Sequence, residues 1–195
     1  MGINIEEKGG FIYCTCDKII GTEINLDFPS VGATENIILA TVLSEGTTTI
    51  INAAMEPEIE DLANFLNKMG AKIIGAGTNV IRITGVKQLK EVSYKIMPDR
   101  IEAGTYLCMV AATGGRVELL DVEPEHLTPI LYKLQQCRLQ NRNKSKENNF
   151  RSPQKTYSNR YKNNALPRFS NRYAVCFWSN AYKCKGDFCY NRKYF

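Results

Sequence analysis

Four stretches of the first 137 residues carry apolar residues three and four positions apart, which is the spacing of one helix face. They are residues 31–43, 56–69, 97–113 and 123–134. Two of the four open with a Glu-Pro-Glu triplet, in which proline suits the first helical turn because its missing N–H would have no partner there. Gly70 follows the second stretch, and glycine favours the end of a helix. The pattern predicts four helices, each with one apolar face.

Between these helices the sequence turns to β-branched and aromatic residues, which favour strands. The predicted strands are residues 11–13, 24–26, 47–54 and 117–120, with a hairpin over residues 71–85 that turns near Gly75 and Gly77. The same order of elements occurs twice, and the two Glu-Pro-Glu starts, at Glu56 and Glu123, lie 67 residues apart. This period predicts a duplicated α/β unit whose copies pack together, because neither copy buries its apolar face alone.

Charge divides the chain near residue 137. Residues 1–137 hold 11 of the 25 basic and 18 of the 20 acidic residues, which gives this part a net charge of −7. Residues 138–195 hold the other 14 basic and 2 acidic residues, a net charge of +12, so the overall +5 averages two unlike parts. We expect residues 1–137 to form a partial domain of about two repeat units and residues 138–195 to form a basic, disordered tail.

Composition excludes several classes of protein. No run of 18 apolar residues is present, so no membrane span is expected, and the N-terminus MGINIEEKGG lacks the pattern of a signal peptide. The seven cysteines are an odd number without zinc-ligand spacing, since Cys14 and Cys16 are too close together for a zinc knuckle. We expect a cytoplasmic protein with reduced thiols, with Cys14, Cys16 and Cys108 in the core, and with no metal or other cofactor.

Three motifs in the acidic part are specific enough to indicate a known family. They are FPSVGATEN (residues 28–36), the stretch that begins EGTTTIINAAMEPEIEDL and ends TNVIRITG (residues 45–85), and MPDRIEAGT (residues 97–105). Together they closely resemble the UDP-N-acetylglucosamine 1-carboxyvinyltransferase family of enolpyruvyl transferases, from about Gly9 to Cys137. The resemblance implies two domains, each an inside-out α/β barrel of three repeated units with helices inside and sheets outside.

Members of that family transfer the enolpyruvyl group of phosphoenolpyruvate to the 3-hydroxyl of UDP-N-acetylglucosamine through a tetrahedral intermediate. This is the first committed step of peptidoglycan synthesis, on which cell-wall biogenesis, cell shape and cell division depend. The family's general acid, a loop cysteine in most members, lies upstream of the motif at Phe28, and its base, an aspartate, follows the segment that ends at Cys137. The resemblance therefore implies that this chain holds no catalytic residue, and we expect no activity from it alone.

By the same resemblance, substrate contacts fall on two segments. Ser30, Val31 and Gly32 match the loop that contacts the nucleotide part of the sugar substrate. Such a loop before a helix offers backbone N–H donors at the positive end of the helix dipole. Asp99 and Arg100 match a Pro-Asp-Arg turn that faces the cleft between the family's two domains.

Glu56 and Glu58 match family carboxylates and are further possible site residues. The residue before them is often arginine in the family but is Met55 here, which weakens a role in a charged network. His126, the only histidine, lies in the first turn of a predicted helix and is expected to be structural. A purely structural role at a helix start is an alternative for Ser30, Glu56, Glu58, Asp99 and Arg100.

The tail has two interpretations. Its ten asparagines, six tyrosines and basic charge suggest an arm that stacks on nucleic acid, although no RNP, zinc or helix-turn-helix signature accompanies them. Alternatively, the tail is the wrong reading frame of the same gene. Back-translated from Glu147 with freely chosen codons and read one nucleotide later, it yields TMPYPGFPTDMQ and AKGTSVITENIF, which resemble the family's next unit. We therefore expect a one-nucleotide insertion or two-nucleotide deletion in the codons for residues 137–146.

Three functions remain open from the sequence. The first is a fragment of the sugar transferase, with UDP-N-acetylglucosamine and phosphoenolpyruvate as ligands and a separately encoded N-terminal piece as a possible partner. The second is a nucleic-acid-binding module that acts through the tail, although the frame interpretation makes the positive charge weak support for it. The third is the sister enzyme 3-phosphoshikimate 1-carboxyvinyltransferase, which shares the fold. FPSVGATEN and PDRIEAGT favour the sugar enzyme, and no membrane partner is expected.

Overall fold

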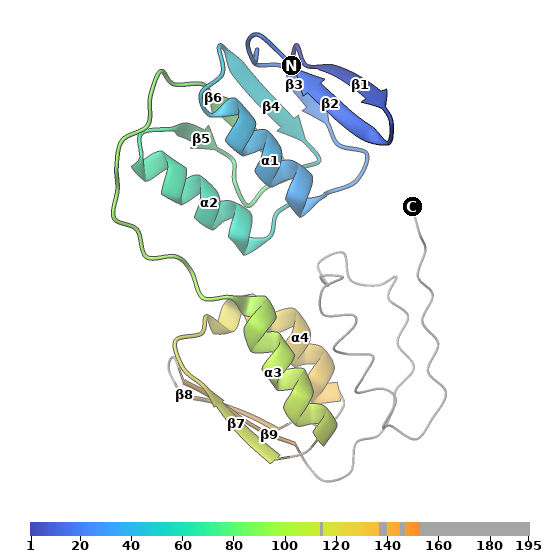
Figure 1. The fold of residues 1–195 in the computed structure, drawn as a ribbon. Coiled ribbons are helices and arrows are strands. Elements are labelled where there is room, and N and C mark those ends of the chain that lie inside the picture. Colours follow the sequence, from blue (N-terminus) through green and yellow to red (C-terminus); the bar gives the residue numbers. More distant parts are fainter. Residues whose placement is uncertain (114, 137–139, 145–146, 153–195) are drawn as a thin grey trace. The chain divides into compact units, whose positions relative to one another are not determined.

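The computed structural model describes residues 1–113, 115–136, 140–144 and 147–152. The chain divides into two units, Met1–Met97 and Pro98–Phe195 (Figure 1). In the described residues helices alternate with sheets in both units, so the α/β class predicted from the sequence is confirmed. In that part of the chain no helix combines the length and the apolar character that crossing a membrane requires.

A four-stranded mixed sheet in the order β3-β4-β6-β5 forms the body of unit 1. Strand β3 runs parallel to β4, and β6 is antiparallel to both β4 and β5. Ile50 of β4 pairs with Ile81 of β6 and both are completely buried, whereas the neighbouring Arg82 is exposed, so one face of the sheet is apolar. The strand bounds are β3 (Glu23–Asn25), β4 (Thr47–Ile51), β5 (Lys72–Ile74) and β6 (Val80–Thr84).

Helices α1 (Val31–Thr41) and α2 (Pro57–Lys68) cover the apolar face of this sheet (Figure 1). Helix α1 starts after Ser30 and α2 starts with Pro57 in its first turn, as the sequence predicts. Strand β4 is shorter than predicted because Asn52, the residue after it, has a left-handed backbone with φ of 60°. The core between helices and sheet consists of Ile38, Val42, Ile50, Ala53, Ala54, Ile59, Ala63, Leu66, Ala71, Ile73, Ile81 and Ile83.

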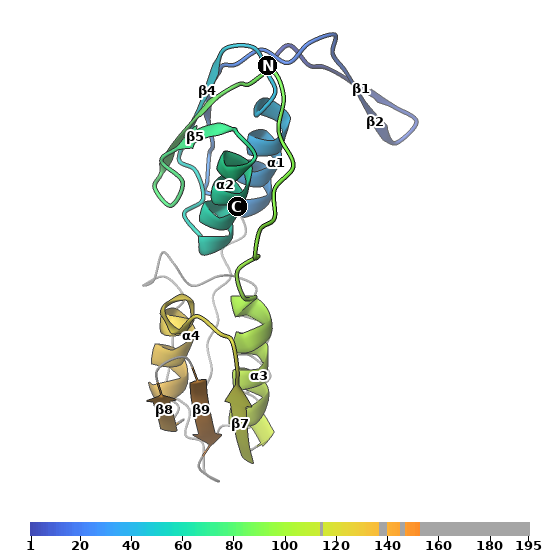
Figure 2. The same cartoon turned by 90° about the vertical axis from the view of Figure 1, so that its left-hand side faces the viewer.

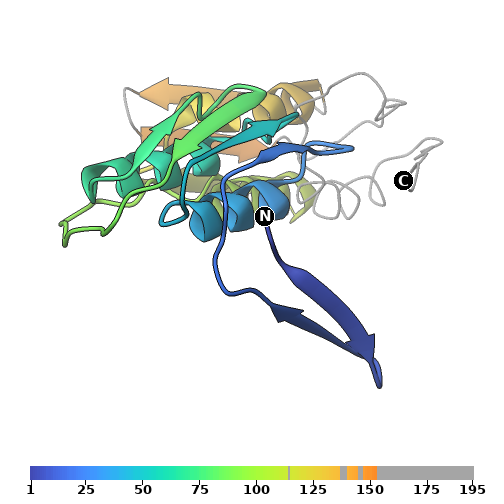
Figure 3. The same ribbon diagram turned by 90° about the horizontal axis from the view of Figure 1, so that it is seen from above.

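A separate antiparallel hairpin, β1 (Asn4–Lys8) and β2 (Phe11–Thr15), projects away from the rest of unit 1 (Figures 2 and 3). Every residue of both strands is exposed, because a two-stranded ribbon without a second layer has nothing to cover its faces. The prediction that Cys14 and Cys16 are core thiols is therefore wrong. Cys108 is buried in unit 2, as predicted.

Unit 2 repeats the architecture of unit 1. Helices α3 (Arg100–Thr113) and α4 (Pro124–Gln136) accompany a sheet of β7 (Gly115–Leu119), β8 (Gln140–Lys144) and β9 (Glu147–Ser152). The order β7-β9-β8, with antiparallel pairing throughout, matches β4-β6-β5 of unit 1, so the predicted duplication is confirmed. The core of unit 2 consists of Ala103, Leu107, Cys108, Ala111, Leu127, Ile130, Leu131 and Leu134.

Strands β8 and β9 lie within the segment for which the sequence predicts a disordered tail. The structure differs from that prediction at residues 140–144 and 147–152, where β9 pairs antiparallel with β7 and β8 pairs antiparallel with β9. They occupy the places that β5 and β6 hold in unit 1, so the topology of the repeat accounts for them better than local composition does. The rest of the predicted tail, residues 153–195, lies outside the described residues.

Apolar side chains remain on the outer faces of α1 and α3. Leu39 of α1 is 53% exposed, and Leu43, two residues after the end of that helix, is 56% exposed. Tyr106 and Met109 of α3 are 46% and 54% exposed. A helix that is apolar on all sides is usually buried on all sides. Within the described residues, each unit therefore leaves one apolar helix face uncovered.

Candidate functional site

The start of α1 is the first candidate site. Ser30 caps the helix: its Oγ accepts the N–H of Ala33 at 3.3 Å, and its carbonyl accepts the N–H of Thr34 at 2.9 Å. The N–H groups of Val31 and Gly32 lie in the first turn, where helix geometry provides no internal partner. The structure therefore confirms Ser30 as a cap and presents two backbone donors beside it.

The first turn of α1 contains no acidic residue, whereas α2 carries Glu58 and Glu60 there and α3 carries Glu102. Gly32 is exposed, and a Cβ added to it would meet no atom within 4 Å. The positive end of the helix dipole is thus open to an approaching anion, and the missing side chain at residue 32 leaves the backbone accessible.

The second predicted group, Glu56 and Glu58, lies at the start of α2. The segment leading to Glu56 is tied to α1, because the N–H of Ala54 donates to the Thr34 hydroxyl at 3.1 Å. The side chain of Glu56 makes no capping hydrogen bond, and Glu58 is an acidic residue of the first turn. Their positions fit the structural alternative, in which carboxylates stabilise a helix start.

Asp99 and Arg100 lie in unit 2, at the start of α3. Asp99 Oδ1 accepts the N–H groups of Ile101 at 2.7 Å and Glu102 at 3.1 Å, so Asp99 is the cap of this helix. Arg100 is only 7% exposed, which is unusual for a charged side chain. The structure thus gives Asp99 a structural role and places Arg100 in a protected position next to it.

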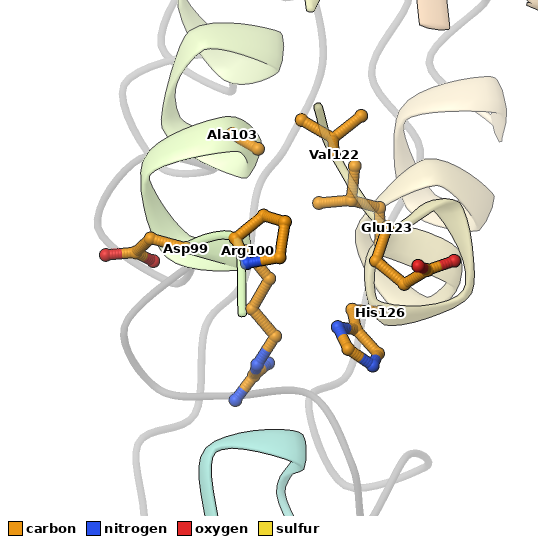
Figure 4. Close-up of a pocket in the computed structure, with 8 residues that line it drawn as sticks. Asp99, Arg100, Ala103, Val122, Glu123 and His126 are labelled. Carbon is orange, nitrogen blue, oxygen red and sulfur yellow. The ribbon is translucent and has the colours of Figure 1, made fainter. Parts of the chain in front are cut away.

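Arg100 also lines a shallow recess where the starts of α3 and α4 meet (Figure 4). The side chains of Arg100 and His126 extend to the same side of this recess, while the Asp99 carboxylate points away. His126 Nδ1 is buried and has no hydrogen-bond partner among the described residues. The empty space of about 160 Å³ includes open solvent, so the recess is a shallow surface feature and not an enclosed ligand pocket. The recess is lined by Pro98, Asp99, Arg100, Ala103, Val122, Glu123, His126 and Leu127.

The sequence did not place His126 beside Arg100, because the two residues lie 26 positions apart and only packing of α3 on α4 brings them together. It also did not point to Thr34 or Asn52, whose side chains hold the segment around Ser30. Asn52 has one sequence signal, since asparagine directly after a strand is among the few residues that tolerate a left-handed backbone.

A family model described as EPSP synthase (3-phosphoshikimate 1-carboxyvinyltransferase) matches residues 1–165. The chain belongs to the EPSP synthase family. Curated relatives are more than half identical in sequence to this chain over about 70% of its length. UDP-N-acetylglucosamine 1-carboxyvinyltransferase 1 of Carboxydothermus hydrogenoformans is 59% identical over 137 residues, which are 70% of this chain and 33% of the relative. UDP-N-acetylglucosamine 1-carboxyvinyltransferase 2 of Caldanaerobacter subterraneus is 55% identical over 145 residues, 73% of this chain and 35% of the relative.

Solved structures confirm the fold at lower identity. The enolpyruvyl transferase NikO from Streptomyces tendae superposes with a TM-score of 0.70 at 20% identity, over 83% of this chain and 42% of that one. EPSP synthase from Acinetobacter baumannii superposes with a TM-score of 0.53 at 23% identity, over 78% of this chain and 37% of that one. The chain has the enolpyruvyl transferase fold and spans about a third of the length of the curated relatives named above. The resemblance inferred from the three motifs is confirmed.

Proposed function

We propose that this chain is the nucleotide-sugar-binding part of a UDP-N-acetylglucosamine 1-carboxyvinyltransferase. Relatives that carry this name are 52–60% identical over about 70% of the chain, which favours the sugar enzyme over its 3-phosphoshikimate sister. The observation that carries the proposal is the open start of α1, where Ser30, Val31 and Gly32 present backbone N–H groups without an acidic residue in the turn.

The chemistry of the substrate fits this helix end. UDP-N-acetylglucosamine contains a diphosphate, and phosphate groups bind helix N-termini through backbone N–H groups and the positive end of the dipole. Gly32 allows the phosphate oxygens to come close because no side chain stands in the way. In the complete enzyme, phosphoenolpyruvate would donate its enolpyruvyl group to the 3-hydroxyl of the sugar, with release of inorganic phosphate.

Asp99 and Arg100 are the second proposed contact. Arg100 carries a permanent charge at the start of α3, and the recess beside it is shallow, so a ligand would meet this part of unit 2 at its surface. Asp99 contributes indirectly by capping α3 and so holding the neighbouring arginine in place. Glu56 and Glu58 are proposed as helix-start carboxylates.

Substitution of Gly32 by alanine tests the proposal. The new methyl group meets no atom of the protein and improves helix propensity, so the fold is expected to keep or slightly gain stability. Affinity for UDP-N-acetylglucosamine, measured by calorimetry on the 195-residue chain, is expected to fall roughly tenfold because the methyl group displaces the diphosphate. Asn64→Ala is the matched control, since it makes a similar change in propensity on the exposed face of α2. Equal affinities of Gly32→Ala and Asn64→Ala would reject the site.

We also propose that the chain is a fragment whose coding frame changes near residues 137–146. Strands β8 and β9 support this, because their 5 and 6 residues include Phe150 as the only apolar one, whereas β5 and β6 read KII and VIRIT. The repeat keeps its strand order while its sequence loses the apolar alternation. Sequencing of the gene tests this proposal. Codons 147–195, read one base later, must encode the amino-acid sequence of the family's next unit, and any other encoded sequence rejects the proposal.

The remaining expectations stay proposals. The exposed apolar faces of α1 and α3 suit a partner that supplies the rest of the fold, such as a separately encoded N-terminal piece. The free thiols of Cys14, Cys16 and Cys108 suit a reducing, cytoplasmic location.

The basic segment proposed for nucleic acid lies largely outside the described residues, and a gel shift with and without residues 138–195 tests it. A phosphate-release assay with both substrates tests the prediction that the chain alone has no transferase activity.

A further inference from the structure

Asn52 holds an unusual backbone conformation immediately after strand β4. Its φ of 60° lies in the left-handed region, which among the described non-glycine residues is shared only by Asp121. This conformation costs most residues free energy, and asparagine tolerates it better than others because its short amide side chain can bond locally. The conformation ends β4 and turns the Asn52 side chain toward the chain segment that follows β3.

The amide of Asn52 reaches that segment. Its Nδ2 donates to the carbonyl of Leu26 at 2.8 Å, and the N–H of Leu26 donates to the carbonyl of Ile51 at 3.0 Å. Both polar groups of the Leu26 backbone are therefore held by two successive residues, Ile51 and Asn52. This clamp fixes the chain four residues before Ser30, just beyond the last paired residue of β3.

Thr34 fixes the same segment on its other side. Its hydroxyl, which is completely buried, donates to the Ser30 carbonyl at 2.8 Å and accepts the N–H of Ala54 at 3.1 Å. The loop over residues 26–34 is thus tied at both ends to the short segment over residues 51–54. The start of α1, with the half-buried Val31 and the exposed Gly32, lies between the two ties.

We propose that Asn52 is a positioning residue that sets the place of the Ser30-Val31-Gly32 loop. The inference rests on the proposed function, in which this loop binds the diphosphate of a nucleotide sugar. Binding groups work best when a second layer of hydrogen bonds holds them in the binding geometry, and the Asn52 side chain supplies this layer from the residue that follows β4. The left-handed backbone of Asn52 is the conformation that directs its amide to the Leu26 carbonyl.

Asn52→Gly tests this role. Glycine adopts a positive φ without strain, so the variant removes the amide and keeps the backbone. Hydrogen exchange of the Leu26 and Thr34 amides is expected to accelerate roughly threefold to tenfold, the effect of losing one hydrogen bond, while the amides of β4 and β6 exchange as before. The dissociation constant for UDP-N-acetylglucosamine is expected to rise by a similar factor. Asp121→Gly is the control, since it makes the same backbone change in unit 2.

The outcomes separate this inference from the proposed function. If wild-type chain binds no UDP-N-acetylglucosamine, the proposed function fails, and the exchange data alone decide whether Asn52 holds the loop. If the wild type binds and Asn52→Gly leaves loop exchange or affinity unchanged, Asn52 does not position the site. Faster exchange of β4 and β6 together with the loop would show a general loss of stability and would overturn the inference. Asn52→Asp, which replaces the donor by a carboxylate, should weaken binding at least as much as Asn52→Gly.

Discussion

Two buried threonines of unit 1 offer a direct test of how hydrogen bonding stabilises this fold. Thr34 of α1 and Thr48 of β4 are both completely buried. The Thr34 hydroxyl bridges the Ser30 carbonyl and the Ala54 N–H, whereas the Thr48 hydroxyl has no partner among the described residues. Threonine to valine exchanges the hydroxyl for a methyl group of similar size in both places. The same chemical change should therefore have opposite effects.

The magnitudes follow from these contacts. Burial of a hydroxyl without a partner costs about 1–3 kcal/mol in proteins, so Thr48→Val is expected to raise the free energy of unfolding of unit 1 by about 1 kcal/mol. Valine also suits a strand at least as well as threonine does. Thr34→Val leaves the N–H of Ala54, a completely buried residue, without its partner, which costs about 1–3 kcal/mol. The two variants should differ by roughly 3 kcal/mol, a sum of these two effects.

Native-state hydrogen exchange measures this difference in the intact chain. The slowest amides of β4 and β6 report the unfolding of unit 1 separately from unit 2, which matters because the two units need not unfold together. The wild type should fall between the two variants. A Thr48→Val variant less stable than the wild type, or a Thr34→Val variant of unchanged stability, would refute the reasoning.

Three further predictions concern other contacts. Desolvation raises the pKa of Tyr94 above its ordinary value near 10, and its 2.8 Å hydrogen bond to Asp61 adds to the shift. The folded state therefore favours the neutral phenol, so unit 1 should lose stability as the pH rises above 10, and Tyr94→Phe should remove that part of the loss in urea unfolding curves at pH 9 and 11. Asp99→Ala should destabilise α3 by about 1 kcal/mol and Asp99→Asn by less, seen as exchange of the α3 amides. Gly85→Ala should strongly lower the melting temperature of unit 1, because its Cβ would collide with the backbone carbonyl of Ser44.

Local sequence signals predicted the elements of the fold well because each depends on neighbouring residues. Pro57 and Gly70 bracket α2, and the alternation at Ile81 and Ile83 gives the buried face of β6. The exposure of Cys14 could not be predicted in this way, because periodicity shows which face is apolar but not whether another layer covers it. The same limit applies to Leu39 on the outer face of α1.

The same distinction between local and distant contacts decides which residues of the candidate site could be predicted from the sequence. Ser30 was recognisable because capping depends on the next three residues, and Gly32 because it lies in the same loop. Asn52 bonds Leu26 across 26 residues, and Thr34 bonds Ala54 across 20. Such contacts between a side chain and a distant backbone leave no periodic trace in a single sequence. These contacts can be recognised only from the structure, in which β3 pairs with β4.

Amide NMR of the labelled 195-residue chain, titrated with UDP-N-acetylglucosamine, tests the central claim most directly. The account predicts saturable shifts of the Val31, Gly32 and Ala33 amides, and no such shifts when N-acetylglucosamine without the nucleotide is added. Unchanged α1 amides at millimolar ligand, or shifts confined to residues outside the start of α1, would contradict it.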